Sequence, residues 1–461
     1  MHETPLNLSA REQVSAVVQG RLTVEALMEA TLMRVAATNG TLNAVVAMRD
    51  VEILLGEARA LDKAGPRGPL AGLPTAIKDL HEARGLPNSQ GSAIFAGQIS
   101  VADDPHVARM RAAGALFIGK TNVPEFGLGS HSYNPVFGVT CNPYAPHLSA
   151  GGSSGGAAAA LAAGMMALAD GSDMMGSLRN PAGWCNIYGM RPTHGLVPGA
   201  EGGDLYLHKL STRGPMARSP DDLALFLDVL AGSQTFEALT PRIEGLRIGW
   251  LGDWGGALPT EPGILSLCDS ALGTCESLGA PVTALGAPLA REVIWEAWTD
   301  LRSFTVAAEA QDLYTDPATR AQLKPEAVWE IERGLALSAM EVHAASLKRS
   351  DWHRAAMTLF ETYDLLALPS AQVWPFAVET HWPGSIGRVP MDTYHRWMEV
   401  VVPASLLGLP AVCVPAGFGE TRLPMGLQLI GPPGSDRKVL EAAEAYHRAT
   451  HWPQTRPPEM I

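Results

Sequence analysis

Short apolar runs bounded by glycine and proline alternate with helical patterns along most of this chain. The apolar runs lie at 70–78, 114–119, 165–169, 247–251, 365–368 and 411–415. The 3.6-residue repeat of apolar positions is clearest at 9–39, 49–64, 221–230 and 262–278. Runs of the first kind are typical of buried strands, and the repeat is typical of helices that cover them. The alternation predicts a mixed α/β fold.

The length of 461 residues gives a prior of about three domains. The sequence shows no internal repeat and no clear linker, so we predict one large α/β unit over 1–461. Residues 290–400 are the best candidate for an insertion or cap, because they hold seven of the eleven tryptophans. These tryptophans either anchor helices in the core or line a substrate entrance.

Charge and hydropathy exclude several classes of protein. The net charge is −13 and no basic run is present, which argues against a nucleic-acid ligand. The longest low-polarity stretch, 155–169, is shorter than the roughly 20 residues of a membrane span. Residues 1–30 mix charged and apolar residues and lack the apolar core of a signal peptide. We therefore expect a cytoplasmic protein without membrane contact.

Cysteine and histidine usage points to neither disulfides nor a metal. The five cysteines form an odd set without CxxC, which favours free thiols in a reducing compartment. The thirteen histidines show neither H-E-x-x-H nor a Cys/His cluster, so we expect no metal and no other cofactor.

The glycine-rich segment 150–156 allows three interpretations. A phosphate cradle would need the lysine of a P-loop, which is missing. A nucleophile elbow fits Gly-Gly-Ser153-Ser-Gly, but residues 142–149 contain two prolines and cannot be the central strand that an elbow requires. That alternative would also need a histidine base, for which His343 and His353 are candidates. The third interpretation is a small-residue turn for close packing.

A second serine changes the balance between these interpretations. Ser177 lies 24 residues beyond Ser153 and follows an apolar strand and a glycine-rich turn at 171–176, so it is predicted at a strand's carboxyl end. Backbone amides there can converge on an oxyanion. The amides concerned belong to Met174, Met175, Gly176 and Ser177. Lys78 ends an apolar strand 75 residues before Ser153, and a lysine buried away from water can act as a neutral base.

Several segments together resemble the amidase signature hydrolases. They are Gly72–Asp79, Gly119–Phe126, Ala150–Gly156, Gly171–Pro181, Gly189–Gly195, Gly214–Arg218, Leu407–Pro415 and Leu423–Gly431. The resemblance implies one large α/β fold around a mixed, mostly parallel central sheet. It also implies a triad in which Ser177 is the nucleophile, Ser153 bridges through a cis peptide, and Lys78 is the base. Ser154, Asp173 and Arg179 match positions that support the site by hydrogen bonds, although simple turn capping is an alternative.

One departure from the family pattern is Met175-Gly176, where the family usually has two glycines. The methionine is expected to narrow or reshape the acyl pocket, which weakens an assignment to the tRNA amidotransferase branch. The lack of an evident partner-binding tail points the same way.

The resemblance implies hydrolysis of carboxylic amides, and by the same chemistry of esters and carbamates. Trp374, Phe376 and Trp382 suggest a pocket for aryl or other apolar groups. The expected partner is a small-molecule amide, bound by a monomer or a homodimer. Two alternatives are a glutamine-dependent amidotransferase subunit, which passes ammonia to a partner protein, and a catalytically inactive binding protein.

Overall fold

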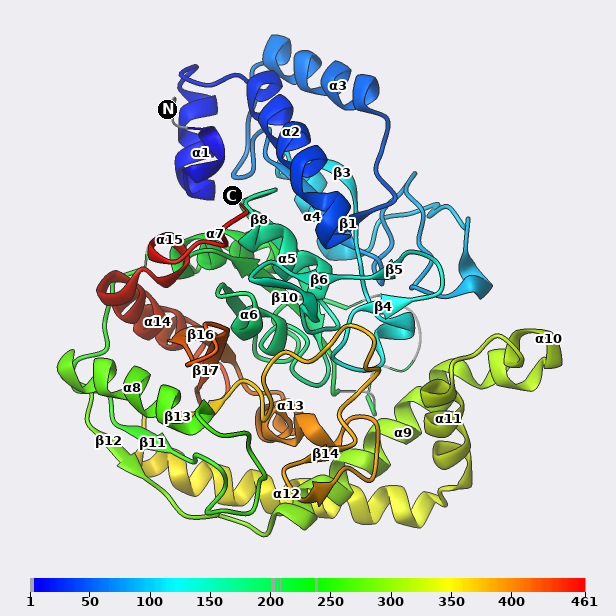
Figure 1. Cartoon of the computed structure of the whole chain (residues 1–461), viewed down its shortest axis with the longest axis vertical. Helices are drawn as coiled ribbons and strands as arrows, with labels where there is room; N and C mark the ends of the chain where they lie inside the picture. The colour runs from blue at the N-terminus through cyan, green and yellow to red at the C-terminus, as the bar shows by residue number, and fades with distance from the viewer. Residues whose placement is uncertain (1–3, 200–203, 205, 208, 237–238, 461) are drawn as a thin grey trace.

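An eight-stranded mixed sheet runs through the centre of the computed structural model, which describes residues 4–199, 204, 206–207, 209–236 and 239–460 (Figure 1). In spatial order its strands are β12 (Val282–Ala284), β11 (Ile248–Trp250), β13 (Leu365–Pro369), β17 (Pro424–Ile430), β16 (Ala411–Phe418), β9 (Tyr188–Arg191), β10 (Thr212–Ala217) and β8 (Leu168–Asp173).

The predicted α/β fold with a mixed sheet is confirmed, but the sheet is not mostly parallel. Strand β11 pairs in parallel with β12 and β13, whereas the other neighbours in this sheet pair antiparallel. Strands β16 and β17 are joined by a short turn and so form a hairpin, which needs no crossover helix.

A separate three-stranded sheet carries Lys78. It contains β1 (Val45–Val46), β3 (Leu116–Thr121) and β2 (Pro74–Lys78), with β2 and β3 parallel. Helix α4 (Pro105–Ala112) lies between β2 and β3 in the chain and supplies the crossover that a parallel pair needs. Strand β2 contacts β8, so the ends of both strands meet at one place.

Helices cover the large sheet, and most coincide with the predicted periodic segments. Helices α7 (Pro220–Ala231), α8 (Ile264–Ser277) and α14 (Asp436–Thr450) pack on its strands, as do the short α5 (Gly155–Ala162) and α6 (Asn180–Trp184). The pattern at 9–39 divides into α1 (Ala10–Val18) and α2 (Val24–Leu42), because Gly20 has a positive φ and Thr23 caps the second helix. Helix α3 spans Val51–Ala64.

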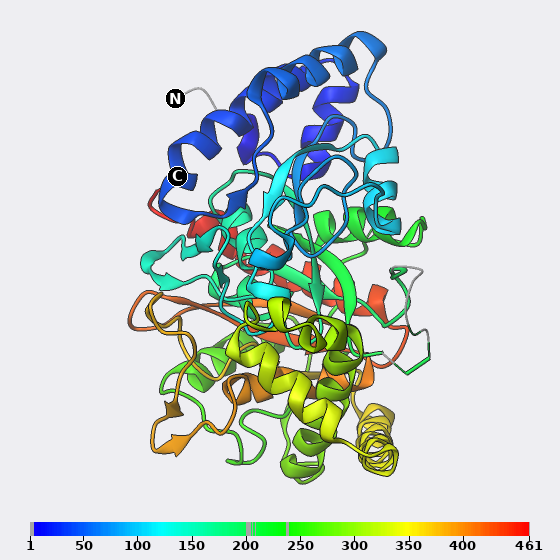
Figure 2. The same ribbon diagram turned by 90° about the vertical axis from the view of Figure 1, so that its right-hand side faces the viewer.

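A helical group lies at the end of the molecule opposite the N-terminal helices (Figure 2). It consists of α9 (Arg291–Thr315), α10 (Pro317–Arg320), α11 (Pro325–Ala336) and α12 (Ala339–Thr362), with α13 (Val402–Leu407) beside it. Trp298, Trp352 and Trp397 are fully buried here. These three therefore fit the interpretation as core anchors.

The remaining elements are short. They are β4 (Tyr133–Asn134), β5 (Gly138–Val139), β6 (Cys141–Asn142), β7 (Ala145–Ser149), β14 (Ser385–Ile386), β15 (Val389–Pro390), α15 (Trp452–Thr455) and the 3-10 turns Pro5–Asn7, Ala93–Phe95, Glu125–Gly127 and Arg396–Val401. All five cysteines are free, as predicted. Across the described ranges no helix combines the length and apolarity needed to cross a bilayer.

The strand before Ser177 differs from its prediction. The sequence favours a strand at 165–169 and a turn at 171–176, whereas β8 continues to Asp173. The reason is that β10 pairs with β8 along its whole length, from Leu168 to Asp173. Pairing with a distant segment thus holds Gly171 and Ser172 in extended backbone that their own sequence does not favour.

Candidate active site

Lys78 is the last residue of β2, and its side chain is fully buried. Its Nζ lies 3.0 Å from Ser153 Oγ and 2.8 Å from Ser154 Oγ. The same atom lies 3.1 Å from the Oγ of Ser172 and 3.2 Å from its carbonyl oxygen. Burial lowers the pKa of Lys78 to about 7, although the charges of Asp170 and Asp173 oppose this shift. Much of the amine is therefore neutral near pH 7.

The four oxygens around this amine restrict how protons are shared. A neutral amine has two N–H groups and one lone pair, and the Ser172 carbonyl can only accept. At least one neighbouring hydroxyl must then donate to the lone pair. Ser154 Oγ has a second acceptor, because it lies 3.5 Å from the Ser172 carbonyl. Ser153 lines the cavity described below, so its hydroxyl proton is well placed to move to Lys78.

Ser153 lies in the glycine-rich loop that leads from β7 into α5. The Gly152–Ser153 peptide bond is cis, as the family resemblance implies. Gly156 packs against a neighbouring strand end so closely that a Cβ atom there would lie 2.3 Å from the amide nitrogen of Asn122. The glycines therefore let the loop and the start of α5 sit directly against the end of β3.

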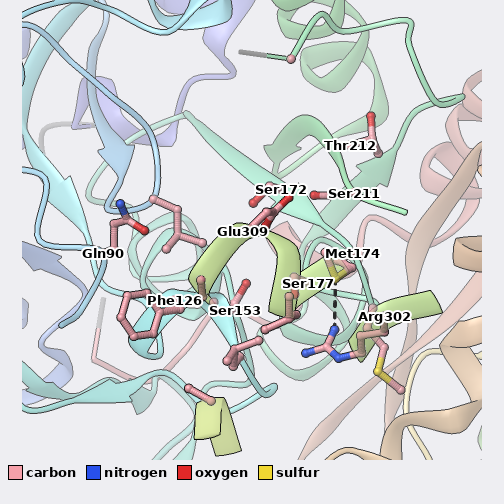
Figure 3. Close-up of a pocket in the computed structure, with 18 of the residues that line it drawn as sticks. Gln90, Phe126, Ser153, Ser172, Met174, Ser177, Ser211, Thr212, Arg302 and Glu309 are labelled. Atoms are coloured by element: carbon pink, nitrogen blue, oxygen red, sulfur yellow. Dashed lines mark hydrogen bonds between the residues drawn. The ribbon is translucent and has the colours of Figure 1, made fainter. Parts of the chain in front are cut away.

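Ser177 lies in the turn between β8 and α6, as predicted. Its carbonyl oxygen accepts a hydrogen bond from the amide of Ser154 at 3.3 Å, which joins the two serine segments. Its side chain lines one cavity together with Ser153 and Ser172 (Figure 3). The structure therefore brings the three residues of the predicted triad to one place, and their catalytic roles remain predictions.

The predicted set of oxyanion amides needs one correction. The amide of Gly176 donates to Oδ1 of Asp173 at 2.8 Å, so it is not free to bind an oxyanion. Asp173 accepts it because β8 runs on to this residue and turns its carboxylate back under the loop. The amides of Met174, Met175 and Ser177 remain the predicted donors.

Buried ion pairs hold this turn in place. Asp173 receives Nε and Nη2 of Arg179, each at 3.0 Å, and Nη1 of Arg191 at 3.2 Å. Burial by itself would raise the pKa of Asp173, but the two guanidinium groups outweigh it and hold that pKa well below its usual range. Arg179 also donates to Ser405 Oγ at 2.7 Å, which ties the turn to α13. Asp173, Arg179 and Ser154 thus lie where predicted, whereas Arg191 was missed.

Only one of the two positions before Ser177 requires glycine. Gly176 has a φ of 79°, and a Cβ atom there would lie 2.8 Å from the side chain of Val401. Met175 has no positive φ, and its buried side chain lines the cavity. The departure from the family pattern is therefore compatible with the turn and changes the shape of the cavity.

The cavity at the serines has a volume of about 1050 Å³ and is largely apolar at one side. Its apolar lining includes Leu80, Phe95, Phe126, Leu128, Val306, Leu313, Leu323 and Met398. Several of these residues come from α9 and the segment that follows it, so the region predicted as a cap does border the cavity.

Trp374, Phe376 and Trp382 are not among the described residues that line this cavity, which corrects their predicted role. Phe376 packs edge-on against the rings of Trp184 and Trp397. Trp374 donates from Nε1 to the Pro262 carbonyl oxygen, and Trp382 lines a separate small pocket. Their side chains fill the interior between loops, and helix α9 supplies the cavity wall instead.

Arg302 of α9 reaches the cavity beside Met174 (Figure 3). Its Nε donates to Oε1 of Glu330 at 2.6 Å and its Nη2 to the Tyr394 hydroxyl at 2.7 Å. Its Nη1 has the Met174 sulfur at 3.2 Å, and a thioether is a weak acceptor. The charge of Arg302 is therefore already compensated, while one edge of the guanidinium remains able to donate to a ligand.

A buried cluster of His81, His106 and Asp170 was not visible in the sequence spacing. The three side chains are close enough to hold a metal ion. However, His81 Nδ1 lies 2.5 Å from Asp170 Oδ2, which is a hydrogen-bond distance. Two ligands of one tetrahedral zinc ion lie about 3.3 Å apart, given bonds of about 2.0 Å. The contact therefore fits a hydrogen bond better than a metal site.

The alternative histidine bases do not reach the cavity. His343 and His353 both lie on α12 with exposed side chains, away from the described residues that line the cavity. His194 does line it, and burial lowers its pKa. The geometry thus gives no support to a histidine-based triad on Ser153.

Comparisons with known proteins agree with the arrangement of the site. Residues 26–440 match the sequence model of a family described as Amidase. A glutamyl-tRNA(Gln) amidotransferase subunit from Thermus thermophilus is 35% identical over 482 residues, which cover 96% of this chain and 97% of that protein. The acylamidase of Rhodococcus erythropolis is 32% identical over 473 residues, 98% of both. A solved bacterial aryl acylamidase of the amidase signature enzymes matches with a TM-score of 0.90 at 27% identity, over 98% of each chain.

Proposed function

Because the chain belongs to the amidase signature family, we propose that it hydrolyses carboxylic amides with apolar or aromatic groups through an acyl-enzyme on Ser177. The observation that carries this proposal is the buried amine of Lys78, which contacts Ser153 at 3.0 Å beside the cavity that Ser177 lines. A neutral amine in that position gives a serine nucleophile its base.

The proposed reaction moves two protons in one relay. Lys78 takes the proton of Ser153 while Ser153 takes the proton of Ser177, and Ser177 Oγ attacks the carbonyl carbon. The resulting oxyanion is stabilised by backbone amides of the turn at 174–177. The protonated amine then returns its proton through Ser153 to the leaving nitrogen, which departs as a neutral amine. Water hydrolyses the acyl-enzyme by the same relay in reverse.

Esters and carbamates are proposed as further substrates, because their hydrolysis passes through a similar tetrahedral oxyanion. The apolar lining from Leu80, Phe126 and α9 supports an apolar or aryl substituent on the substrate. The compensated guanidinium of Arg302 supports a neutral acceptor, such as a carbonyl or ether oxygen, in the same substrate.

An amidotransferase component is the second candidate, since one such protein is 35% identical to this chain. Its reaction requires glutamine, whose α-carboxylate needs a cationic partner. Among the described residues lining the cavity, Arg302 already faces Glu330 at 2.6 Å and Arg213 faces Asp104 at 3.7 Å. This pairing favours a neutral substrate over glutamine.

A comparison of substrates tests the choice. The wild-type protein is expected to release aniline from simple anilides, with kcat/KM at least about 100-fold higher than for ammonia release from L-glutamine, because leaving a carboxylate without a partner costs several kcal/mol. Both products are measured directly, with the Ser177→Ala variant as the blank. A higher kcat/KM for glutamine would reverse the choice.

The Met175→Gly variant tests how the cavity selects substrates. Removing this side chain is expected to raise kcat/KM for a branched-acyl anilide relative to an acetanilide by about 10-fold, since a pocket methylene is worth about 1–3 kcal/mol. It should also lower the free energy of unfolding by about 2–5 kcal/mol. Met425→Ala, a buried methionine away from the cavity lining, is the control. An unchanged ratio of the two substrates would show that Met175 does not shape the acyl pocket.

A further inference from the structure

Lys78 is held from outside its own sheet. Strand β2 belongs to the three-stranded sheet, while β8 is the edge strand of the eight-stranded sheet, so no ladder of either sheet joins them. The amide of Lys78 instead donates to Oδ1 of Asp170, in the middle of β8, at 2.9 Å. One carboxylate therefore fixes the residue that carries the amine against the strand that leads to Ser177.

Two histidines from other segments hold this carboxylate. His81, just after β2, lies with Nδ1 2.5 Å from Asp170 Oδ2, and His106 of α4 lies with Nε2 3.5 Å from the same oxygen. His106 Nε2 is also 3.2 Å from His81 Nδ1. All three side chains are buried, and Nδ1 of His106 has no hydrogen-bond partner among the described residues. The cluster is thus built inside the protein and is not a solvated surface pair.

The carboxylate is charged in this setting. Burial alone would raise the pKa of Asp170, but hydrogen bonds from His106 and His81 outweigh it and hold the pKa well below its usual range. Burial, followed by the neighbouring His106, lowers the pKa of His81 well below its usual value, so His81 is neutral. Asp170 therefore contributes a negative charge close to Lys78, which favours the protonated amine.

Resting on the proposed function, we propose that Asp170, clamped by His81 and His106, is the positioning residue that sets both the place and the proton affinity of Lys78. The carboxylate fixes the backbone of Lys78 across the gap between the two sheets. Its charge keeps the amine basic enough to accept a proton from Ser153 although the amine is fully buried. Neither effect requires contact between Asp170 and the substrate.

Other charged groups near Lys78 are already balanced or more distant. Asp173 is paired with Arg179 and Arg191, and Lys120 on β3 lies 3.9 Å from Asp79. Arg213 on β10 acts on His81 through its charge and faces Asp104. Asp170 is thus the carboxylate that bonds directly to the segment carrying Lys78, and its removal should change Lys78 most.

Two substitutions separate position from charge. Asp170→Asn keeps an oxygen acceptor for the Lys78 amide and removes the charge, so the acid limb of the pH profile should move to lower pH by about one unit or more. Asp170→Ala removes the acceptor as well, so kcat should fall by about 100-fold with little change in KM, the size expected when a catalytic group is misplaced by about 1 Å. Partial recovery of kcat in Asp170→Asn relative to Asp170→Ala is also expected.

The readout should not depend on choosing the right substrate. The rate at which a sulfonyl fluoride modifies Ser177 is measured against pH in the wild type and in each variant, beside anilide kinetics. Modification without anilide hydrolysis in the wild type would count against the proposed function alone. If Asp170→Ala does not fold, Asp170→Asn still decides, and a limb that does not move in Asp170→Asn overturns the proposal.

Two controls complete the test. Thr75→Val removes another side-chain bond between β2 and β8, the 2.9 Å bond from Thr75 Oγ1 to the Leu168 carbonyl oxygen, and should leave the acid limb in place. The same shift in Thr75→Val would show that loose packing, and not Asp170, is responsible. Elemental analysis of the purified protein is expected to find no stoichiometric metal. About one bound zinc per chain would make the cluster a metal site and overturn the proposal.

Discussion

Replacing Ser177 with alanine is expected to lower kcat/KM for an anilide by at least about 10⁴-fold, because the nucleophile of a serine hydrolase has no substitute within the site. The fold should be unaffected, since the lost hydroxyl faces the cavity and the Ser177 carbonyl still accepts from Ser154. The measurements are steady-state kinetics together with the thermal unfolding midpoint.

Ser211→Ala is the matched control, because Ser211 lines the same cavity from its exposed side. It should retain activity within about 3-fold, as expected of a surface change away from the reacting atoms. If Ser177→Ala kept more than about a tenth of the wild-type rate, the acyl-enzyme on Ser177 would be wrong.

Replacing Lys78 with methionine is expected to lower kcat by at least about 10³-fold, since general-base catalysis contributes about 10²–10⁴-fold and this base serves two proton transfers. KM should change little, because Lys78 lies behind Ser153 and is not among the described residues that line the cavity. Methionine matches the buried stem of lysine, so the protein should stay folded even though three serine oxygens lose a partner.

Lys324→Met distinguishes a specific base from any buried lysine. Burial also lowers the pKa of Lys324, to about 8, but its Nζ donates to the Leu128 carbonyl oxygen, and no contact with the serines is described. This variant should retain activity within about 3-fold. Equal losses in Lys324→Met and Lys78→Met would show that lysine burial, and not the contact with Ser153, matters.

Placement of the three central residues could be predicted because each ends or follows an element with a strong local pattern. Lys78 ends an apolar strand, Ser153 precedes a run of alanines, and Ser177 follows a strand and a glycine turn. Those local patterns survive folding. The exact strand end did not, because β10 extended β8 to Asp173 and placed its carboxylate on the Gly176 amide.

The wall of the cavity could not be predicted in the same way. Trp374 and Phe376 suggested an apolar lining, but which face of a side chain meets a cavity depends on packing between distant elements, and α9 took that place. His81, His106 and Asp170 come from a loop, a helix and a strand far apart in the sequence. Only their assembly in space shows that they form one cluster.

The most direct measurement is the pKa of Lys78 itself. Carbon-13 NMR of protein labelled at the lysine ε-carbons can follow each amine with pH, and the signal missing in Lys78→Met assigns Lys78. The account predicts titration at about 7, with the signal kept in Lys324→Met. A Lys78 signal that titrates near ~10.4, the value of a solvated lysine, would contradict the central claim.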